Sequence, residues 1–305
     1  MFPGRALLAL CLAFLILATP SIPAASAEEP SAENQVVEEA LPADETVEFQ
    51  SASTWPPELA LINRYRIAAG VRPAEINPSL DRSASSHVLY YDANRGDPSL
   101  AGMGLHEETP GRPEFTGTTM AQRARAAGYS GGTVTENAGY GSFEGAVEWY
   151  MNSINHRLPL IHPSALDMGY SVSASSRFSI VAVGLKRGGD EVPPVSLYPA
   201  PDAADVPVSW DGSEAPDPAP GLPRPLGYPI TVAFGINQNV QWQAFALDGP
   251  DGQPVGIAIS RKDWMRAAGI IPKHPLDPGA TYTVRVEATV DGQPFSKDWS
   301  FTTAP

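Results

Sequence analysis

The sequence predicts an α+β domain followed by an all-β domain. Apolar residues recur at helical spacing between residues 55 and 190, while apolar and polar residues alternate along short runs after residue 229. A proline-rich stretch separates the two patterns. The chain has 305 residues, which at roughly 150 residues per domain allows two domains, each large enough to bury a core.

The N-terminus has the pattern of a secretory signal peptide. An apolar stretch from Leu7 to Ala18 follows Arg5 and precedes the small residues Ala25-Ser26-Ala27, which predicts a signal peptide over residues 1–27. About 12 apolar residues fall short of the roughly 20 that cross a bilayer, so we expect no integral membrane segment in the mature chain. The protein is predicted to be secreted and to act outside the cell or at its surface.

Cysteine and charge exclude several classes of function. Cys11, the only cysteine, lies inside the expected signal peptide, so the mature chain would have no thiol, no disulfide and no cysteine-bound zinc. The 20 basic and 34 acidic residues give a net charge of −14. Eight acidic and no basic residues fall between residues 28 and 48, which predicts an acidic disordered spacer over residues 28–50. Without a basic run, nucleic acid is not an expected partner.

Residues 51–190 carry the helical pattern of the first domain. Helices are expected from Pro57 to Ala69, from Pro78 after an Asn77 cap, from Thr119 to Ala127, and after Ser142. Strands are expected at Met168–Val172 and Phe178–Leu185. We therefore expect helices packed on a small antiparallel sheet.

The C-terminal part has the pattern of a β-sandwich. Residues 191–229 are either a proline-rich linker or the start of the β domain, and the main β domain is assigned to residues 230–305. Short β runs are expected at residues 230–234, 240–247 and 255–259. Alternating residues on both sides of Asp291-Gly292 predict a hairpin with one buried face. Several strands in about 100 residues favour a sandwich.

Common catalytic motifs are absent from the sequence. There is no Gly-x-Ser-x-Gly elbow, phosphate-binding loop, dinucleotide fingerprint or His-Glu-x-x-His helix, and Pro110 interrupts the only similar start, His106-Glu107-Glu108. Four of the five histidines, His87, His106, His156 and His162, lie in the first domain together with Glu136.

Five segments of this domain resemble a known family. They are Leu61-Ile62-Asn63-Arg64-Tyr65-Arg66, Leu105-His106, Arg123-Ala124-Arg125-Ala126-Ala127-Gly128-Tyr129, Glu136-Asn137 and Trp149-Tyr150-Met151-Asn152-Ser153-Ile154-Asn155-His156-Arg157. In this order they resemble the CAP superfamily of cysteine-rich secretory, antigen 5 and pathogenesis-related proteins (SCP-like domains), in its bacterial form. The resemblance implies an α-β-α sandwich with a cleft lined by His106, Glu136 and His156. The second glutamate of eukaryotic members is replaced here by Asn152, which we expect in the cleft as a hydrogen-bonding residue.

Several functions are compatible with such a cleft. The leading expectation is binding of an extracellular small molecule, lipid, cell-wall component or protein, either directly or through a divalent metal such as Zn²⁺ held by His106, His156 and Glu136. An alternative is a secreted zinc-dependent hydrolase with Glu136 as general base. A third reading is a structural or adhesive surface protein that acts through the β-sandwich. We expect binding to be favoured over catalysis.

The remaining candidates have plainer explanations. Glu148, Asn152 and His156 would share one helix stripe if the helix reached His156, and such a stripe is usually a polar face. We interpret His87 as a satisfied core or surface histidine, His162 as a loop residue, and His274 as a residue without an evident partner.

The C-terminal module resembles bacterial immunoglobulin-like domains. The resemblance rests on residues 275–282 and on the closing Trp299-Ser300-Phe301-Thr302-Thr303. Such modules imply spacing or attachment at a cell surface. Trp242 and Trp264 could stack on a carbohydrate, although tryptophans on strands more often belong to the core.

Overall fold

The computed structural model describes residues 55–186 and 195–305, which belong to one compact unit. The expected signal peptide at residues 1–27 and the acidic spacer at residues 28–50 lie outside the described residues. No helix within the described ranges is long and apolar enough to cross a membrane.

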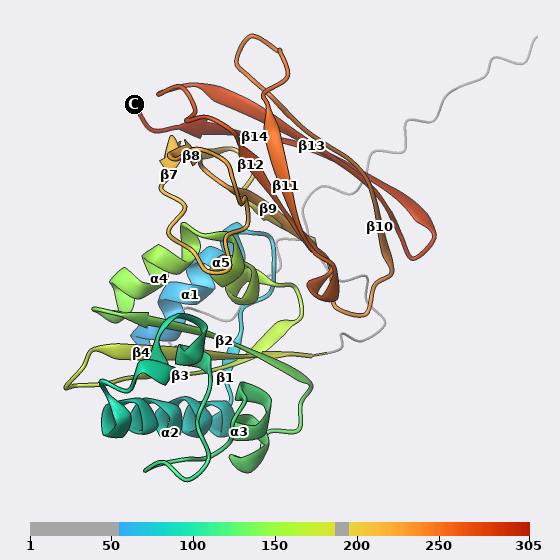
Figure 1. Ribbon diagram of the computed structural model, residues 1–305. Coiled ribbons are helices and arrows are strands. Elements are labelled where there is room, and N and C mark those ends of the chain that lie inside the picture. Colours follow the sequence, from blue (N-terminus) through green and yellow to red (C-terminus); the bar gives the residue numbers. More distant parts are fainter. Residues whose placement is uncertain (1–54, 187–194) are drawn as a thin grey trace, which may run out of the picture. The chain divides into compact units, whose positions relative to one another are not determined.

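The first region has three layers (Figure 1). Its helices are α1 (Pro57–Ala68), α2 (Pro78–Asn94), α3 (Met120–Ala126), α4 (Phe143–Met151) and α5 (Ile154–Ile161), with the short 3-10 helices η2 (Pro98–Leu100) and η3 (Gly102–His106). Its strands are β1 (Glu75–Ile76), β2 (Thr133–Tyr140), β3 (Ala165–Val172) and β4 (Phe178–Leu185). The sheet order is β1-β3-β4-β2, with β1 parallel to β3 and the other pairs antiparallel. Helices α2 and α3 cover one face of this sheet, and α1, α4 and α5 cover the other, which gives the expected three layers. The expectation of an antiparallel sheet is wrong at one edge, because the short strand β1 pairs parallel with β3.

Local capping explains where the helices begin. The Asn77 side chain accepts hydrogen bonds from the backbone N–H groups of Ser79 and Leu80, and Ser142 accepts one from Gly145. These are the helix starts that the sequence predicts. Strand β2 and helix α5 were not among the expected elements, and both carry residues of the cleft.

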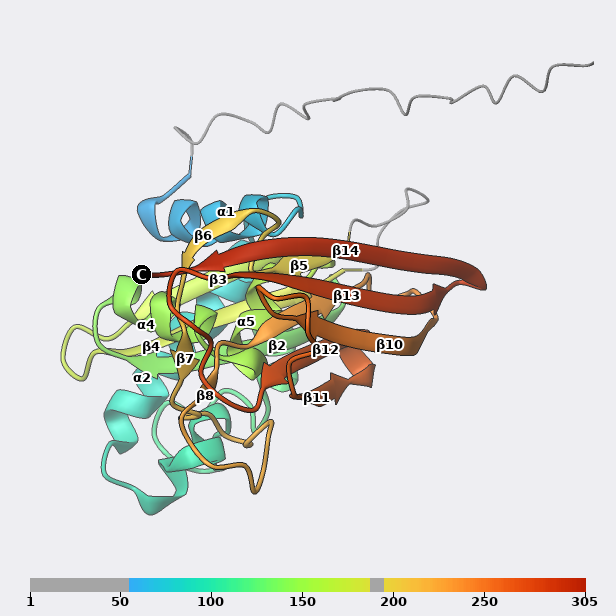
Figure 2. The ribbon, with the colours of Figure 1, turned by 90° about the horizontal axis from the view of Figure 1, so that it is seen from above.

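The second region contains two four-stranded sheets. Its elements are β5 (Ser196–Tyr198), β6 (Ala203–Val206), β7 (Ser209–Trp210), β8 (Leu226–Gly227), β9 (Ile230–Ala233), β10 (Val240–Asp248), β11 (Ile257–Lys262), the 3-10 helix η4 (Asp263–Met265), β12 (Ala267–Pro272), β13 (Thr281–Val290) and β14 (Gln293–Thr303). One sheet has the order β10-β13-β14-β6 (Figure 2) and the other β11-β12-β9-β5, and β7 pairs with β8 separately. Apolar residues from both sheets form one core, so the region is a sandwich. Its assignment as immunoglobulin-like stays a prediction.

The predicted hairpin is present in the expected register. Val290 pairs with Gln293, which leaves Asp291 and Gly292 as a two-residue turn with φ values of 51° and 83°. Both angles are left-handed, which two-residue hairpin turns of this kind require. Tyr282, Val284, Val286 and Ala288 are all buried, as the alternation predicts.

The proline-rich segment contributes strands to the sandwich. Within residues 195–229 lie β5, β6, β7 and β8, and β5 pairs with β9. The described part of this segment therefore has the structure of the start of the β-rich region. The exact domain boundaries stay predictions.

The two regions share a hydrophobic core. One cluster joins Leu59, Val147 and Ile154 of the first region to Leu226 and Ile271 of the second, and several further buried residues extend it. At the contact, the Ile154 side chain fills the space beside Gly269 of β12, where an added Cβ would lie only 2.7 Å from Ile154 Cδ1. Helix α5 therefore packs closely on the β-rich region.

Candidate functional site

His106 and Glu136 form a partly buried hydrogen-bonded pair. His106 ends η3, and its Nδ1 lies 3.1 Å from Oε1 of Glu136 on β2. The second oxygen of Glu136 accepts a hydrogen bond of 2.8 Å from the guanidinium of Arg123 on α3. The Glu136 side chain is 2% exposed and that of His106 is 15% exposed. Arg123 also donates to the backbone carbonyl of His106, so it fixes both partners.

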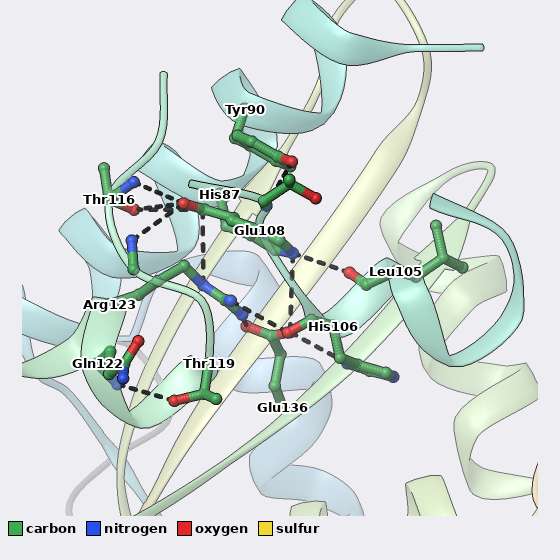
Figure 3. Close-up of polar contacts among 12 residues, drawn as sticks. His87, Tyr90, Leu105, His106, Glu108, Thr116, Thr119, Gln122, Arg123 and Glu136 are labelled. Carbon is green, nitrogen blue, oxygen red and sulfur yellow. Dashed lines mark hydrogen bonds and ion pairs between the residues drawn. The ribbon is translucent and has the colours of Figure 1, made fainter. Parts of the chain in front are cut away.

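A second carboxylate, that of Glu108, lies near this pair, with Oε1 3.8 Å from Nε of Arg123 (Figure 3). Glu108 accepts a hydrogen bond from His87 Nδ1 at 2.9 Å, and the other ring nitrogen of His87 lies 2.8 Å from the carbonyl of Leu105. The His87 ring is thus held at both nitrogens, by a side chain and by the backbone. Glu108 also accepts the backbone N–H groups of Thr116 and Gly117, which anchors the loop before α3.

The network balances two buried carboxylates with cations. Burial opposes ionisation of Glu136, but the hydrogen bond from His106 and the charges of Arg123 and His87 outweigh it and lower the pKa of Glu136 to about 2. Glu136 is therefore ionised throughout the physiological range. His87 is a satisfied core histidine, one of the two readings that the sequence left open.

His156 is held by a carboxylate from the β-rich region. Its Nδ1 lies 3.0 Å from Oε1 of Glu214, whose side chain is fully buried. The same carboxylate accepts the backbone N–H groups of Ile154, Asn155 and His156 at the start of α5. Glu214 therefore caps this helix and orients the imidazole at the same time.

The helix stripe considered from the sequence does not form. Helix α4 ends at Met151 and α5 begins at Ile154, so Glu148, Asn152 and His156 do not share one helix. The side-chain oxygen of Asn152 instead accepts a hydrogen bond of 3.0 Å from the Tyr228 hydroxyl. The helix is interrupted between Met151 and Ile154, because Ser153 adopts an extended conformation before α5.

Three of the four expected cleft residues line one cavity. A cavity of about 290 Å³ is bounded by His106, Glu136 and His156, and Asn152 is not among its lining residues. The opposite wall comes from the β-rich region through Lys262, Trp264 and Met265. The remaining lining residues are Met103, Met120, Thr135, Asn137, Asn155, Leu158, Pro159, Ala215 and Pro216.

The two cavity histidines have the same hydrogen-bonding arrangement. In each ring Nδ1 faces a carboxylate, Glu136 for His106 and Glu214 for His156. Because an ionised carboxylate only accepts hydrogen bonds, Nδ1 carries the hydrogen and Nε2 of the neutral ring keeps its lone pair. Figure 3 shows the second nitrogen of His106 on the side of the ring away from Glu136.

This donor set fits a metal only in part. Both oxygens of Glu136 are occupied by His106 and Arg123, so Glu136 does not fit as a direct ligand. A carboxylate on the far nitrogen of a ligating histidine is a common outer partner at metal sites, and both histidines have one. Within the described ranges no group of three or more His, Cys, Asp or Glu is arranged to hold a metal. The chain therefore offers two nitrogens, from His106 and His156.

The other sequence candidates lie in different places. His162 follows the last residue of α5, is fully buried, accepts a hydrogen bond from the Ser164 N–H and donates to the Met265 carbonyl at 2.7 Å. Trp242 packs with Phe234 and Phe245 in the sandwich, which agrees with a core role. Trp264 is 53% exposed and lines the cavity, so it is not a core residue.

Four polar residues of the site did not emerge from sequence reasoning. Arg123 belonged to a family-like segment without an assigned role, His87 was set aside, and Glu108 was dismissed with the broken His-Glu-x-x-His pattern. Glu214 lies 58 residues from His156, so no local sequence pattern indicates that the two side chains meet.

The fold and the site together define a protein with a CAP-type domain whose cleft contains two carboxylate-paired histidines. Residues 59–184 match the family model described as "Cysteine-rich secretory protein family" (CAP). These residues are therefore a CAP domain, as the sequence resemblance implied. Among curated proteins, none matches the chain.

Two solved structures match part of the chain. An extracellular protein containing an SCP domain from Bacillus anthracis str. Ames is 18% identical, with a TM-score of 0.35, over 42% of this chain and 39% of that one. An outer surface protein from Borrelia burgdorferi is 20% identical, with a TM-score of 0.33, over 41% of this chain and 86% of that one. The chain thus spans about two fifths of the length of the Bacillus protein.

Proposed function

We propose that the protein is exported and binds a small extracellular ligand in the cavity between the CAP domain and the β-rich region. One observation carries this proposal: two histidines with matching carboxylate partners line the same cavity. Each ring offers an Nε2 lone pair to a hydrogen-bond donor or to a metal. The volume of about 290 Å³ lies near the lower end of the range of roughly 300–1,000 Å³ for small-molecule sites, which favours a small ligand over a polymer.

The cavity walls favour an amphiphilic anion as the ligand. Three methionines, Leu158, Pro159 and the Trp264 indole supply apolar surface. Lys262 supplies a positive charge, and in the described ranges no carboxylate forms an ion pair with it. The acidic side chain of Glu136 is already balanced by Arg123, so the cavity wall favours a negatively charged group on the ligand.

Zn²⁺ is compatible with binding in this cavity but is not required for it. His106 and His156 would hold the ion, with Glu136 and Glu214 as their outer partners. A bound Zn²⁺ would supply open coordination positions for an oxygen of the ligand. The hydrolase alternative needs Glu136 as a base, and its two oxygens are already bound by His106 and Arg123. The geometry therefore supports binding more than catalysis.

Calorimetric titration of the full chain with Zn²⁺ tests the metal-dependent form of this proposal. We expect binding at pH 7.5 that weakens at pH 5.5, because protons compete with the metal for imidazole nitrogens. The His106→Ala/His156→Ala variant should lose binding, whereas His274→Ala, at an exposed histidine outside the cavity, should keep it. Absence of Zn²⁺ binding in the wild type would reject the metal and the hydrolase together.

Direct binding is tested with small organic anions. Aliphatic and aromatic carboxylates titrated into labelled protein should shift the resonances of His106, His156 and Trp264. If no such anion shifts these residues and Zn²⁺ does not bind, the cleft proposal fails. Attachment to cells by the protein would then support the adhesive alternative.

A further inference from the structure

We propose that Glu214 is a positioning residue of the CAP cleft, which fixes the tautomer and orientation of His156 from outside the CAP domain. The proposal rests on the proposed function, since it concerns one of the two histidines of the cavity. The β-rich region would then control the hydrogen-bonding state of a cavity histidine, in addition to lining part of the cavity.

The hydrogen bonds around Glu214 determine the tautomer. Its carboxylate accepts three backbone N–H groups at the start of α5, so it is stabilised as an anion and has no hydrogen to donate. The 3.0 Å contact to His156 Nδ1 must therefore be an N–H···O bond. Ser153 Oγ, 3.2 Å from the same nitrogen, donates to the Tyr150 carbonyl and can thus accept from the ring. Both neighbours place the hydrogen on Nδ1.

The loop around Glu214 is built to hold the carboxylate in place. Asp217 accepts the Ala219 N–H and forms an ion pair of 2.6 Å with Arg224. Beside it, the Asn155 side chain donates to the carbonyl of Pro216 at 2.8 Å, which connects the loop to α5 again. These contacts fix the loop that follows the buried Glu214 side chain, so the carboxylate has little freedom to leave His156.

Aromatic contacts fix the plane of the same imidazole. Tyr150 stacks on His156 with ring centroids 5.5 Å apart and an interplanar angle of 15°. Trp149 lies against it with centroids 4.5 Å apart. Packing sets the plane, but it does not choose which nitrogen carries the hydrogen. The carboxylate of Glu214 selects the tautomer of His156, as the carboxylate of Glu136 selects that of His106.

The decisive variant is Glu214→Leu in the full chain. Leucine has no hydrogen-bond acceptor and so removes the oxygen that faces Nδ1, whereas a glutamine could place its carbonyl oxygen at the position of Oε1 and still accept from Nδ1–H. We expect His156 to be mainly Nδ1–H in the wild type at pH 8 and at least half Nε2–H in the variant. Long-range ¹H–¹⁵N correlation of labelled histidine measures this ratio directly. Glu144→Gln, which alters an exposed carboxylate of α4 without a contact to His156 or to the loop of Glu214, should leave the ratio unchanged.

The outcomes separate this proposal from the proposed function. If wild-type His156 is already Nε2–H, or if Glu214→Leu leaves the tautomer ratio unchanged, the positioning role is wrong, whatever binds in the cavity. The wild-type spectrum decides this point even if the variant does not fold. If the tautomer changes as expected but neither Zn²⁺ nor small anions bind to the wild type, Glu214 positions His156 and the proposed function is wrong.

The two proposals together also predict a binding effect. Where the wild type binds Zn²⁺, Glu214→Leu should weaken binding about 10- to 100-fold, as loss of an outer partner commonly does. Unchanged affinity in a folded variant with an altered tautomer would overturn the contribution of Glu214 to binding.

Discussion

The guanidinium of Arg123 lies 2.8 Å from the carboxylate of Glu136, and both side chains are buried beneath His106. This ion pair joins α3 to β2. Neither charge reaches water, so each depends on the other for its stability in the folded protein.

Removing the carboxylate should therefore destabilise the whole fold. Glu136→Gln leaves the Arg123 charge with only the longer ion pair to Glu108, at 3.8 Å, and we expect the free energy of unfolding to fall by about 3 kcal/mol. Urea denaturation at pH 7.5 measures the loss. Glu144→Gln, in the exposed first turn of α4, should change stability by less than about 0.5 kcal/mol. A loss of similar size in both variants would show that the buried pair has no special role.

Mild acid should destabilise the protein through His162. Burial lowers the pKa of His162 to about 4, although the Met265 carbonyl opposes this shift. An unfolded histidine takes up its proton near pH 6.5, so the contribution of the neutral ring is complete above that pH and is lost as the pH falls toward 4. The loss between pH 7.5 and pH 5 should be on the order of 2 kcal/mol.

The matched variant for this effect is His162→Gln, which removes the titrating ring and keeps a donor for the Met265 carbonyl. It should be less stable than the wild type at pH 7.5 and should show a smaller drop between pH 7.5 and pH 5. Denaturation curves at the two pH values provide the comparison. An equal drop in both proteins would assign the acid sensitivity to other groups.

Arg157 connects α5 to the β-rich region. Its guanidinium donates to the carbonyls of Met151 and Pro229, each at 2.6 Å, and lies 4.5 Å from the ring centroid of Tyr198 and 4.9 Å from that of Tyr228. Lysine cannot reproduce this planar set of contacts, so Arg157→Lys should cost about 2 kcal/mol. Thermal or urea unfolding tests this, with Arg64→Lys at an exposed position as the control. Equal stability of the two variants would contradict the role of Arg157.

The close approach of Gly269 to Ile154 can be tested with two substitutions. An alanine at position 269 would place its Cβ 2.7 Å from Ile154 Cδ1, so Gly269→Ala should cost about 1–3 kcal/mol. Ile154→Val removes that Cδ1 atom, and the double variant should be more stable than the two separate losses predict. Strict additivity in this double-mutant cycle would show that the two residues do not constrain one another.

Local patterns predicted the elements that depend on local interactions. The Asn77 and Ser142 caps and the Asp291-Gly292 turn are satisfied within a few residues, and the sequence placed all three. Strand β2 was missed because its centre, Glu136-Asn137, is polar, and polar residues normally indicate a surface. They are buried here because Arg123 and His106 satisfy Glu136, and because Asn137 donates to the carbonyl of His156.

The family resemblance assigned four residues to a cleft, and their role in binding stays a prediction. His106, Glu136 and His156 line one cavity, while Asn152 does not. Glu214 and Trp264 come from segments whose own sequence carries no sign of the site, because their relation to the cleft exists only after the two regions pack.

The hydrophobic cluster that continues from the CAP domain into the β-rich region also limits modular exchange. The match to the CAP family ends at residue 184, yet the apolar surface around Ile154 is completed by Leu226 and Ile271. A chimera that joins this CAP domain to an unrelated partner would expose that surface to water. The end of the family match is therefore not the end of a folding unit. We expect residues 55–305 to unfold in a single cooperative transition.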